Sequence, residues 1–422
     1  MDLIIKNIRI IDPVTNTDRV TDILSSGGVI KMLGDSTETE NARVIDGTGL
    51  VAFPGLMDMH VHFRDPGLTY KEDILTGADA AKAGGFTAVC CMPNTKPPVD
   101  NAETVKYILD KAKKTGIDIY PVACITKGMK SEELCDFDEL IGAGVKMISD
   151  DGRPVENAEL MRQALEKSVT NGLSVLSHCE DINITKGGII NKGEISEQLG
   201  VKGLDRASED YITAREIALA MSCGAHIHIC HVSTKGSVNI IRAAKADGVN
   251  VTCETAPHYF TFTEKMLLKR DADYRMSPPL RTEEDRAAVE QAVLDGTIDC
   301  IITDHAPHSK EEKADFEKAP NGVIGLETSL AATLTQLYHT GKCDLMHIAR
   351  IMSQNPRKVT GLDELSISEG QPCDITIFDP DYEWEVIPEE LHSKSKNTVF
   401  KGQKLKGKVL YTISKGKVVI EL

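Results

Sequence analysis

The sequence predicts an α/β protein, in which a (β/α)8 barrel is joined to a small β-sandwich domain built from both termini. Two observations lead to this prediction. Between residues 51 and 365, short apolar runs rich in Val, Ile and Cys alternate with amphipathic stretches that end on glycine, as in parallel strands covered by helices. Residues 1–50 and 366–422 instead alternate polar and apolar residues between turn residues, which is typical of antiparallel strands.

Eight apolar runs supply the strands of the predicted barrel, and they begin near residues 51, 86, 117, 145, 173, 225, 249 and 298. Apolar spacings of three and four residues that close on glycine predict helices among them at 102–116, 158–172, 237–248 and 283–296. Eight strand–helix units favour a closed barrel. A doubly wound open sheet is the alternative, but no Gly-x-Gly-x-x-Gly motif follows the first run.

Chain length agrees with two domains, because 422 residues exceed the usual size of a single domain unless that domain is a barrel. We expect residues 51–365 to form the barrel, and residues 1–50 with 366–422 to form the β domain. The glycine-rich stretch 181–200 is predicted to be a loop inserted over one end of the barrel.

Composition narrows the class of partner and the compartment. A formal net charge of −16 argues against nonspecific binding to nucleic acid or to anionic membranes, because like charges repel. No secretory leader and no membrane-spanning run is recognised in the sequence, so we expect a cytoplasmic protein that acts on a small molecule. The eleven cysteines are then expected to be reduced thiols, and those inside apolar runs to be small buried side chains: Cys90, Cys91, Cys230, Cys253 and Cys300.

Polar side chains cluster where the predicted strands end, which is the face that carries the active site in a barrel of this kind. His60 and His62 are two residues apart and therefore point the same way from one strand. The other strand ends contribute Asn94, Asp150, Asp151, His178, His231 and Asp304. Imidazole and carboxylate together are the ligand set of zinc, and four histidines with at least two of these aspartates exceed what one tetrahedral ion uses. The sequence therefore predicts two divalent metal ions.

A two-metal site predicts hydrolysis of an amide-like bond, because paired ions activate water and polarise a carbonyl. The departing nitrogen needs a proton, and a carboxylate beside the water can carry it. Asp304, in the last strand end, is the predicted catalytic residue, and it can also serve as a plain metal ligand.

The motifs resemble those of the metal-dependent amidohydrolases, and in particular those of the larger, two-domain bacterial dihydroorotases. The His-x-His element alone indicates only the superfamily, whereas the arginine that follows it and the Met-Pro-Asn-Thr stretch are similar to dihydroorotases. The resemblance runs through most of the chain, in the stretches DMHVHFRDPG, CMPNTKPPVD, SDDGRPV, LSHCED, CHVST, SPPLR, TDHAPHSKEEK, GLET, NPRKVTGL and IFDP.

This resemblance implies roles for named residues. It implies that His60, His62 and Asp304 hold one metal ion, that His178 and His231 hold the other, and that Asp151 bridges them. It further implies a substrate site in which Arg64 and Asn94 bind a carboxylate, with contacts from His62, Ser277, His308, Asn321 and Gly322. The implied reaction is the reversible ring closure of N-carbamoyl-L-aspartate to dihydroorotate in pyrimidine synthesis.

Two positions depart from the family pattern, and two others leave a choice open. Ser277 stands where relatives usually have asparagine, and Asn321 where an aromatic residue is commoner. Lys146 lies a few residues before Asp151, and a carboxylated lysine bridges the metals in many members of the superfamily. A salt bridge to Asp65 is the structural alternative for Arg64.

Two other functions remain open at this point. A hydantoinase or allantoinase would share the metal ligands but would give Arg64 no carboxylate partner. A noncatalytic scaffold for another pyrimidine enzyme would be expected to lack ligands, and none is missing. The resemblance also implies two kinds of partner, namely further copies of the same chain in a homo-oligomer and the enzyme aspartate transcarbamoylase.

Overall fold

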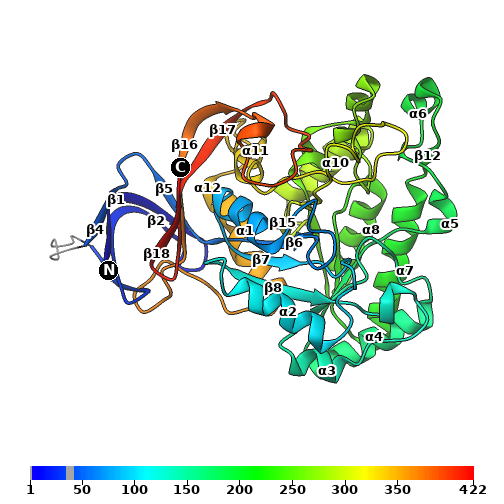
Figure 1. Cartoon of the computed structure of the whole chain (residues 1–422), viewed down its shortest axis with the longest axis horizontal. Helices are drawn as coiled ribbons and strands as arrows, with labels where there is room; N and C mark the ends of the chain where they lie inside the picture. The colour runs from blue at the N-terminus through cyan, green and yellow to red at the C-terminus, as the bar shows by residue number, and fades with distance from the viewer. Residues whose placement is uncertain (1, 35–41) are drawn as a thin grey trace.

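The computed structural model describes residues 2–34 and 42–422 of the chain. Figure 1 shows a sheet that holds both termini at one end of the molecule and a helix-covered barrel at the other. No helix within the described residues is long and apolar enough to cross a membrane.

The barrel is a parallel sheet of eight strands in which each strand pairs with the next along the chain. It closes beyond the last strand, where Val61 bridges His305 and the amide of His62 donates to the His305 carbonyl at 2.8 Å. Every predicted run supplies one barrel strand, although two of the strands have only two residues. The strands are β6 (Leu56–Val61), β7 (Phe86–Cys91), β8 (Asp118–Ala123), β9 (Met147–Ile148), β10 (Ser174–Ser177), β13 (Ile227–Ile229), β14 (Val251–Thr255) and β15 (Cys300–Ile301).

The first predicted run is divided between the two sheets. Its beginning, β5 (Val51–Pro54), pairs antiparallel with β16 (Ile375–Glu385) in the terminal sheet, and only β6 belongs to the barrel. Gly55 separates the two strands, and a Cβ atom there would lie 2.1 Å from Thr87 Oγ1. Glycine is therefore required where the chain passes closely over β7 between one sheet and the other.

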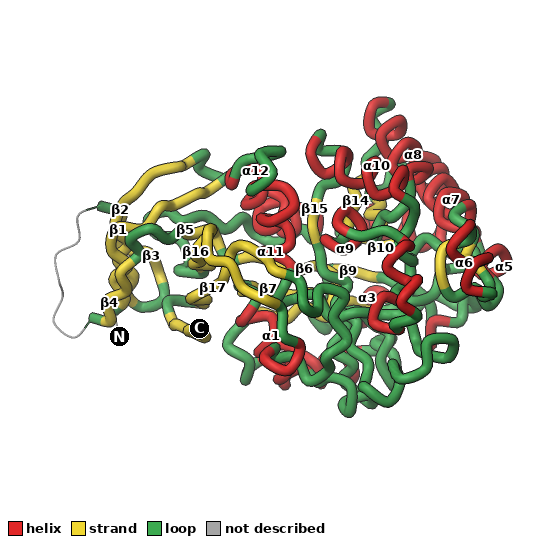
Figure 2. Tube along the Cα trace, turned by 90° about the horizontal axis from the view of Figure 1, so that it is seen from above, coloured by secondary structure: helices red, strands yellow, loops and turns green. Residues whose placement is uncertain are grey.

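Helices follow most of the barrel strands and surround them (Figure 2). Two of the longest end on a left-handed glycine, α4 on Gly172 at φ +67° and α7 on Gly224 at φ +66°, because glycine adopts this conformation at little cost. The main helices are α1 (Ile74–Ala83), α2 (Ala102–Ala112), α3 (Phe137–Gly142), α4 (Ala158–Asn171), α7 (Ala207–Cys223), α8 (Lys235–Ala246), α10 (Glu283–Leu294), α11 (Ser329–Thr333), α12 (Leu345–Ala349) and α13 (Asn355–Val359).

The terminal sheet contains strands from both ends of the chain around an apolar cluster of its own. Most pairs are antiparallel as predicted, but β1 pairs in parallel with β4 and with β5. The chain reverses once between β1 and β2 and again between β2 and β3, so β3 runs in the direction of β1, as β4 and β5 also do. The remaining strands are β1 (Leu3–Asp12), β2 (Thr17–Ser26), β3 (Val29–Leu33), β4 (Arg43–Asp46), β17 (Lys404–Ser414) and β18 (Lys417–Glu421).

The stretch 181–200 is not the plain loop that its glycines predict. It contains the short helices α5 (Ile182–Thr185) and α6 (Glu194–Leu199), and strand β11 (Ile190–Asn191) pairs with β12 (Gly203–Leu204). Paired strands satisfy backbone polar groups that a loop would leave to water, which explains the order in this segment. The exact division of the chain at residues 50 and 365 stays a prediction.

Candidate active site

The six predicted metal ligands come together at the carboxyl ends of the barrel strands. His60 lies in β6 and His62 directly after it, and the other four ligands follow β9, β10, β13 and β15. All six side chains are buried: His60, His62, Asp151, His178, His231 and Asp304. Residues far apart in the sequence therefore form one cluster because parallel strands end on the same face.

One half of the cluster contains His60, His62 and two carboxylates. Asp151 lies 3.3 Å from Nε2 of His60 and, through its second oxygen, 3.3 Å from Nε2 of His62. Asp304 Oδ1 lies 3.1 Å from His62 Nε2 and 3.7 Å from His60 Nε2. Four potential ligand side chains thus face a common point.

The other half of the cluster contains His178 and His231. Their facing nitrogens, Nδ1 of His178 and Nε2 of His231, are 2.9 Å apart. They lie 3.4 and 3.3 Å from the same oxygen of Asp151. Asp151 is therefore the one carboxylate shared by both halves. The histidines outweigh the effect of burial, which by itself would raise its pKa, and hold the pKa of Asp151 well below its usual range.

The hydrogen bonds behind the cluster fit a metal-binding state of the histidines. His60 Nδ1 donates to Glu254 at 2.6 Å, His62 Nδ1 donates to Asn94 at 2.8 Å, and His178 Nε2 donates to Glu180 at 3.2 Å. Each ring then turns an unprotonated nitrogen toward the cluster, which is the arrangement expected of metal ligands. His60 Nε2 is buried and has no hydrogen-bond partner among the described residues, so a cation fits here.

Glu254 and Glu180 are acceptors that the sequence reasoning did not single out. Burial by itself would raise the pKa of Glu254, but His60 and His228 outweigh it and lower this pKa to about 2. Glu254 and Cys230 also form a third group of candidate ligand atoms with His60. The Nδ1 atom that faces Glu254 is already a hydrogen-bond donor, so we assign this group to support of His60. The sequence signal that could have identified Glu254 is the presence of an acidic residue inside the strand-like run VTCET.

Two candidates from the fourth strand are not in the cluster. Asp150 turns away and accepts hydrogen bonds from the amides of Ile125 and Thr126, at 2.8 and 3.1 Å, and from the Thr126 hydroxyl. Successive residues of an extended chain point to opposite sides, which separates it from Asp151. Lys146 is exposed and precedes β9, so it lies toward the amino end of that strand, away from the ligands.

Arg64 is buried and lines the cavity. Its neighbour Asp65 instead accepts from Lys111 at 2.7 Å and from the Tyr107 hydroxyl at 2.8 Å, so the alternative of an Arg64–Asp65 salt bridge is wrong. Arg64 donates to the Pro307 carbonyl at 3.3 Å, and no described carboxylate lies within ion-pair distance of it. Burial lowers the pKa of Arg64 to about 10.

His308 lies beside Arg64 in the loop after β15. Its Nε2 donates to the carbonyl of Asn321 at 2.9 Å, and Nδ1 accepts from Lys71 at 3.1 Å. Burial and the nearby positive charges of Arg64 and Lys71 lower the pKa of His308 to about 2. The imidazole is therefore neutral and held in one orientation.

Five of the six cluster residues, all except the fully buried His60, line one cavity of about 370 Å³ together with the predicted substrate contacts. Gly322 is in its wall at φ +143°, where a Cβ atom would lie 2.7 Å from the Ala306 carbonyl, so no other residue fits. The inserted segment contributes Gly187, Gly188 and, next to it, Leu204. The predicted contacts on this wall are His62, Arg64, Asn94, Ser277, His308, Asn321 and Gly322.

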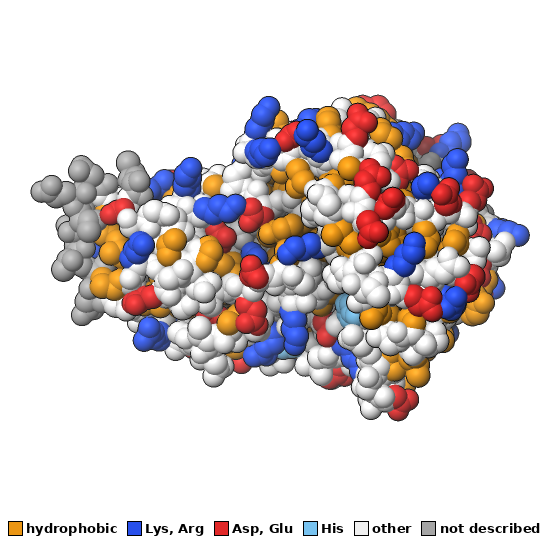
Figure 3. Space-filling model, turned by 90° about the horizontal axis from the view of Figure 1, so that it is seen from below, with side chains coloured by type: hydrophobic (Ala, Val, Ile, Leu, Met, Phe, Trp, Pro, Cys, Tyr) orange, Lys and Arg blue, Asp and Glu red, His pale blue; other side chains and the backbone are white. Residues whose placement is uncertain are grey.

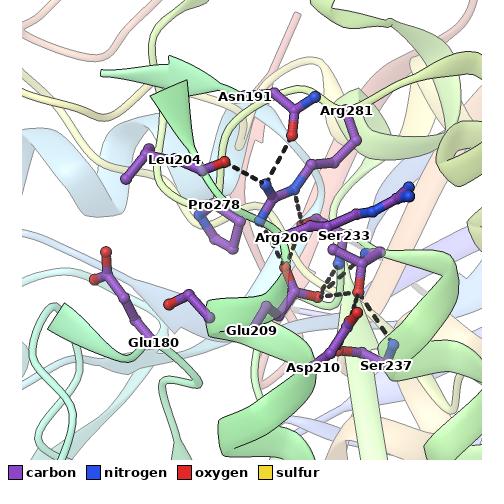
Figure 4. A network of polar contacts seen from close by, with 12 residues as sticks. Glu180, Asn191, Leu204, Arg206, Glu209, Asp210, Ser233, Ser237, Pro278 and Arg281 are labelled. Atoms are coloured by element: carbon purple, nitrogen blue, oxygen red, sulfur yellow. Dashed lines mark hydrogen bonds and ion pairs between the residues drawn. The ribbon is translucent and has the colours of Figure 1, made fainter. Parts of the chain in front are cut away.

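Three residues of the site have positive φ angles although they are not glycine: Arg64 at 60°, His231 at 36° and Asp304 at 48°. Such conformations cost free energy and persist where the surrounding structure holds them. At His231 the surrounding structure is a buried polar network (Figure 4), in which Glu209 of α7 accepts from the amide of Ser233 at 2.9 Å.

Arg281 ties the same network to the inserted segment. It donates to Glu209 at 3.2 Å, to Ser233 at 3.1 Å and to Asn191 of β11 at 2.9 Å, and Figure 4 shows its guanidinium between these groups. All four side chains are buried. The strand tip that carries His231 and the wall formed by the insertion are therefore fixed to each other.

The outer surface differs from this polar interior. Acidic and basic side chains are interspersed on the face shown in Figure 3, with no large area of one sign. This face therefore offers no extended positive area to an anion, whereas the buried Arg64 places a positive charge inside the cavity.

Comparison with known proteins agrees with the geometry of the site. Residues 49–237 match the family model described as Dihydro-orotase-like. The chain is 49% identical over 424 residues to a dihydroorotase of Geobacter sp. (strain M21), with all of both chains covered. It is 45% identical over 420 residues to a dihydroorotase of Acetivibrio thermocellus, with 99% of each covered.

Solved structures show the same architecture in cyclic amide hydrolases. An L-hydantoinase (dihydropyrimidinase) from Arthrobacter aurescens superimposes with a TM-score of 0.86 at 25% identity, covering 100% of this chain and 96% of the other. A dihydropyrimidinase from Brevibacillus agri gives 0.88 at 25% identity, with 100% and 95% covered. The predicted barrel with its terminal β domain is confirmed, and the full-length identity shows that the chain belongs to the dihydroorotase family.

Proposed function

We propose that the chain is a metal-dependent dihydroorotase, which interconverts dihydroorotate and N-carbamoyl-L-aspartate in pyrimidine synthesis. The observation that carries this proposal is Arg64, a buried guanidinium that faces the cavity and has no carboxylate partner among the residues that the structure describes. Leaving such a charge unpaired is costly, and a substrate carboxylate removes that cost while binding in two-point geometry.

We further propose that the histidine–aspartate cluster binds two divalent ions and that these are zinc. His60, His62 and Asp304 would hold one, His178 and His231 the other, and Asp151 would bridge them, in agreement with the two groups of converging ligand atoms around Asp151. Nitrogen and carboxylate donors suit zinc. When bound, the two ions lower the pKa of water and polarise the ring carbonyl.

The chain itself supplies proton transfer and orientation. Asp304 Oδ1 is proposed to take a proton from the attacking water and return it to the departing ring nitrogen. Arg64 and the free amide hydrogens of Asn94 would bind the substrate carboxylate, because the Asn94 oxygen is already used by His62. Neutral His308, the Ser277 hydroxyl and the backbone at Asn321 and Gly322 would complete the wall.

A hydantoinase or dihydropyrimidinase activity is the second candidate, and the fold similarity favours it. Those substrates carry no carboxylate for Arg64. A scaffold role is the third candidate, and the complete ligand set argues against it. Location in the cytoplasm is proposed because all eleven cysteines are free. The partners proposed from the family are a second copy of this chain, in a homo-oligomer, and aspartate transcarbamoylase.

The purified protein tests this proposal. It should convert dihydroorotate to N-carbamoyl-L-aspartate, lose activity on chelation, and regain it with added zinc. Ring closure converts one of the two carboxylates of N-carbamoyl-L-aspartate into the ring amide and takes up one proton. Closure should therefore be favoured at acid pH and ring opening at alkaline pH. Higher activity on allantoin or hydantoin than on dihydroorotate would overturn the assignment.

A further inference from the structure

Residues 391–400, which we call the C-terminal strap, lead from the terminal sheet onto the mouth of the barrel. The strap connects the short helix η6 (Pro388–Glu390) to β17. Its residues alternate, with Ser393, Ser395 and Asn397 buried and His392 and Lys394 exposed. One side of the strap thus faces the barrel although this part of the chain was expected to belong to the β domain.

The buried side of the strap bonds to the loop that follows β6. The Ser393 hydroxyl donates to Glu72, and the Ser395 hydroxyl donates to the Lys71 carbonyl at 2.7 Å. Lys71 is the residue whose ammonium bonds to His308. The strap is therefore fixed to the wall that carries Arg64 and His308.

Asn397 makes the most informative contacts of the strap. Its side-chain oxygen accepts from the amide of His308 at 3.2 Å. Its side-chain nitrogen donates to the carbonyl of Gly322 at 3.0 Å and to that of Ala306 at 3.3 Å. The backbone carbonyl of Asn397 also accepts from the amide of Ile324 at 3.1 Å. One amide side chain thus joins both ends of the loop 306–324.

These contacts all lie behind the substrate wall. Asn397 is 4% exposed and does not line the 370 Å³ cavity, but His308 and Gly322, which it holds, do line it. An amide is the group that can accept from one backbone amide and donate to two carbonyls at once. A carboxylate in its place would face the two carbonyls without a hydrogen to donate.

We propose that Asn397 is a positioning residue for substrate binding, which sets the separation of His308 and Gly322 from outside the barrel. The C-terminal region would thereby complete the site of the barrel. The inference rests on the proposed function for its kinetic consequence, whereas the hydrogen-bonded joint itself does not depend on the identity of the substrate.

Two substitutions and one matched control test the proposal in the full-length, metal-loaded protein. Asn397→Ala removes the joint, and Asn397→Asp keeps its shape and the acceptor for His308 but loses the donor. Lys396→Met is the control, because the hydrogen bonds of the Lys396 ammonium to described residues go to carbonyls of the strap itself, at Leu391 and Ser393. Both Asn397 variants should raise KM for dihydroorotate at least tenfold with kcat within threefold and metal content unchanged, and the control should match the unaltered protein.

Hydrogen exchange supplies a readout that is independent of activity. Amides of residues 306–324 should exchange at least tenfold faster in Asn397→Ala, while those of β13 and α8 should not change. The inference is overturned by any of three results: unchanged exchange of the amides in 306–324, a KM within twofold of the unaltered protein in both Asn397 variants, or a fall in kcat at constant KM. The last result would show only a smaller folded fraction. An unaltered protein that does not turn over dihydroorotate would instead refute the proposed function, and exchange would still decide whether Asn397 joins the loop.

Discussion

Replacing Arg64 by methionine removes the guanidinium but keeps a long side chain that fills most of its space. The substitution should weaken substrate binding and stabilise the fold at the same time. Loss of one partner of a buried charged pair costs about 2 to 5 kcal/mol, which corresponds to a decrease in kcat/KM of about 30-fold to several thousand-fold for dihydroorotate. The decrease should come mainly from KM.

The stability change follows from the buried charge of Arg64, which no carboxylate in the described part of the chain neutralises. Burial lowers its pKa from 12.5 to about 10, and each pKa unit corresponds to about 1.4 kcal/mol, so the charge costs the folded state about 3 kcal/mol. Both the folded and the unfolded chain are protonated at pH 7, so this cost is present in full. Losing the hydrogen bond to Pro307 offsets about 1 kcal/mol. Arg64→Met should therefore raise the free energy of unfolding by about 1 to 3 kcal/mol.

Steady-state kinetics and chemical denaturation of the metal-loaded protein measure the two effects. Arg19→Met is the control, because Arg19 is an exposed arginine of β2 in the terminal sheet, and it should alter neither quantity. An Arg64→Met protein with unchanged KM, or one that is clearly less stable than the unaltered protein, would refute the reasoning that Arg64 is an unpaired charge kept for the substrate.

Three further changes have defined outcomes. Asp151→Asn should reduce the metal content, measured by elemental analysis, from two ions per chain to one or none, whereas the control Lys146→Ala should keep both ions. If the Asp151→Asn protein also kept both ions, the role of Asp151 as a shared ligand would be refuted. Chelation should lower the melting temperature as well as abolish activity, because the buried carboxylates and imidazoles of the cluster then have no ions to bind. An unchanged melting temperature in calorimetry would contradict this. The 2.9 Å hydrogen bond from His392 to Glu327 raises the pKa of His392 in the folded protein. This hydrogen bond should stabilise the fold by less than about 1 kcal/mol, because the site is half-exposed. The stabilisation should be complete below the pKa of His392 in the unfolded chain and should be lost as the pH rises through its pKa in the folded protein. His392→Gln should remove that dependence in denaturation at pH 5 to 8, and an identical pH dependence in the variant would exclude the pair as its source.

The barrel and its ligands could be predicted because their signals are local. Alternating residues at a strand end, as in His60 and His62, fix the direction of side chains, and successive strands of a parallel barrel place their ends together. The same alternation, applied to the adjacent aspartates, separates Asp151 from Asp150. Strand length was less predictable, because β9 and β15 are two-residue stretches whose pairing depends on neighbouring strands, β8 and β10 for β9 and β14 for β15.

The supporting residues could not be predicted because their partners are distant in sequence. Glu254 and His60 are 194 positions apart, and His308 and Asn397 are 89 apart. Nothing in the polar stretch around Asn397 indicates that it crosses from the terminal sheet to the barrel mouth. The order within 181–204 likewise arises from pairing of β11 with β12 and from Arg281, which glycine content does not reveal.

The central claim is that this cavity selects a cyclic amide by its carboxylate, and the most direct measurement compares kcat/KM for dihydroorotate and dihydrouracil, which differ only in that group. The unpaired guanidinium of Arg64 predicts a preference of at least about 100-fold for dihydroorotate, in line with about 3 kcal/mol for one charged contact. Equal values, or a preference for dihydrouracil, would contradict it.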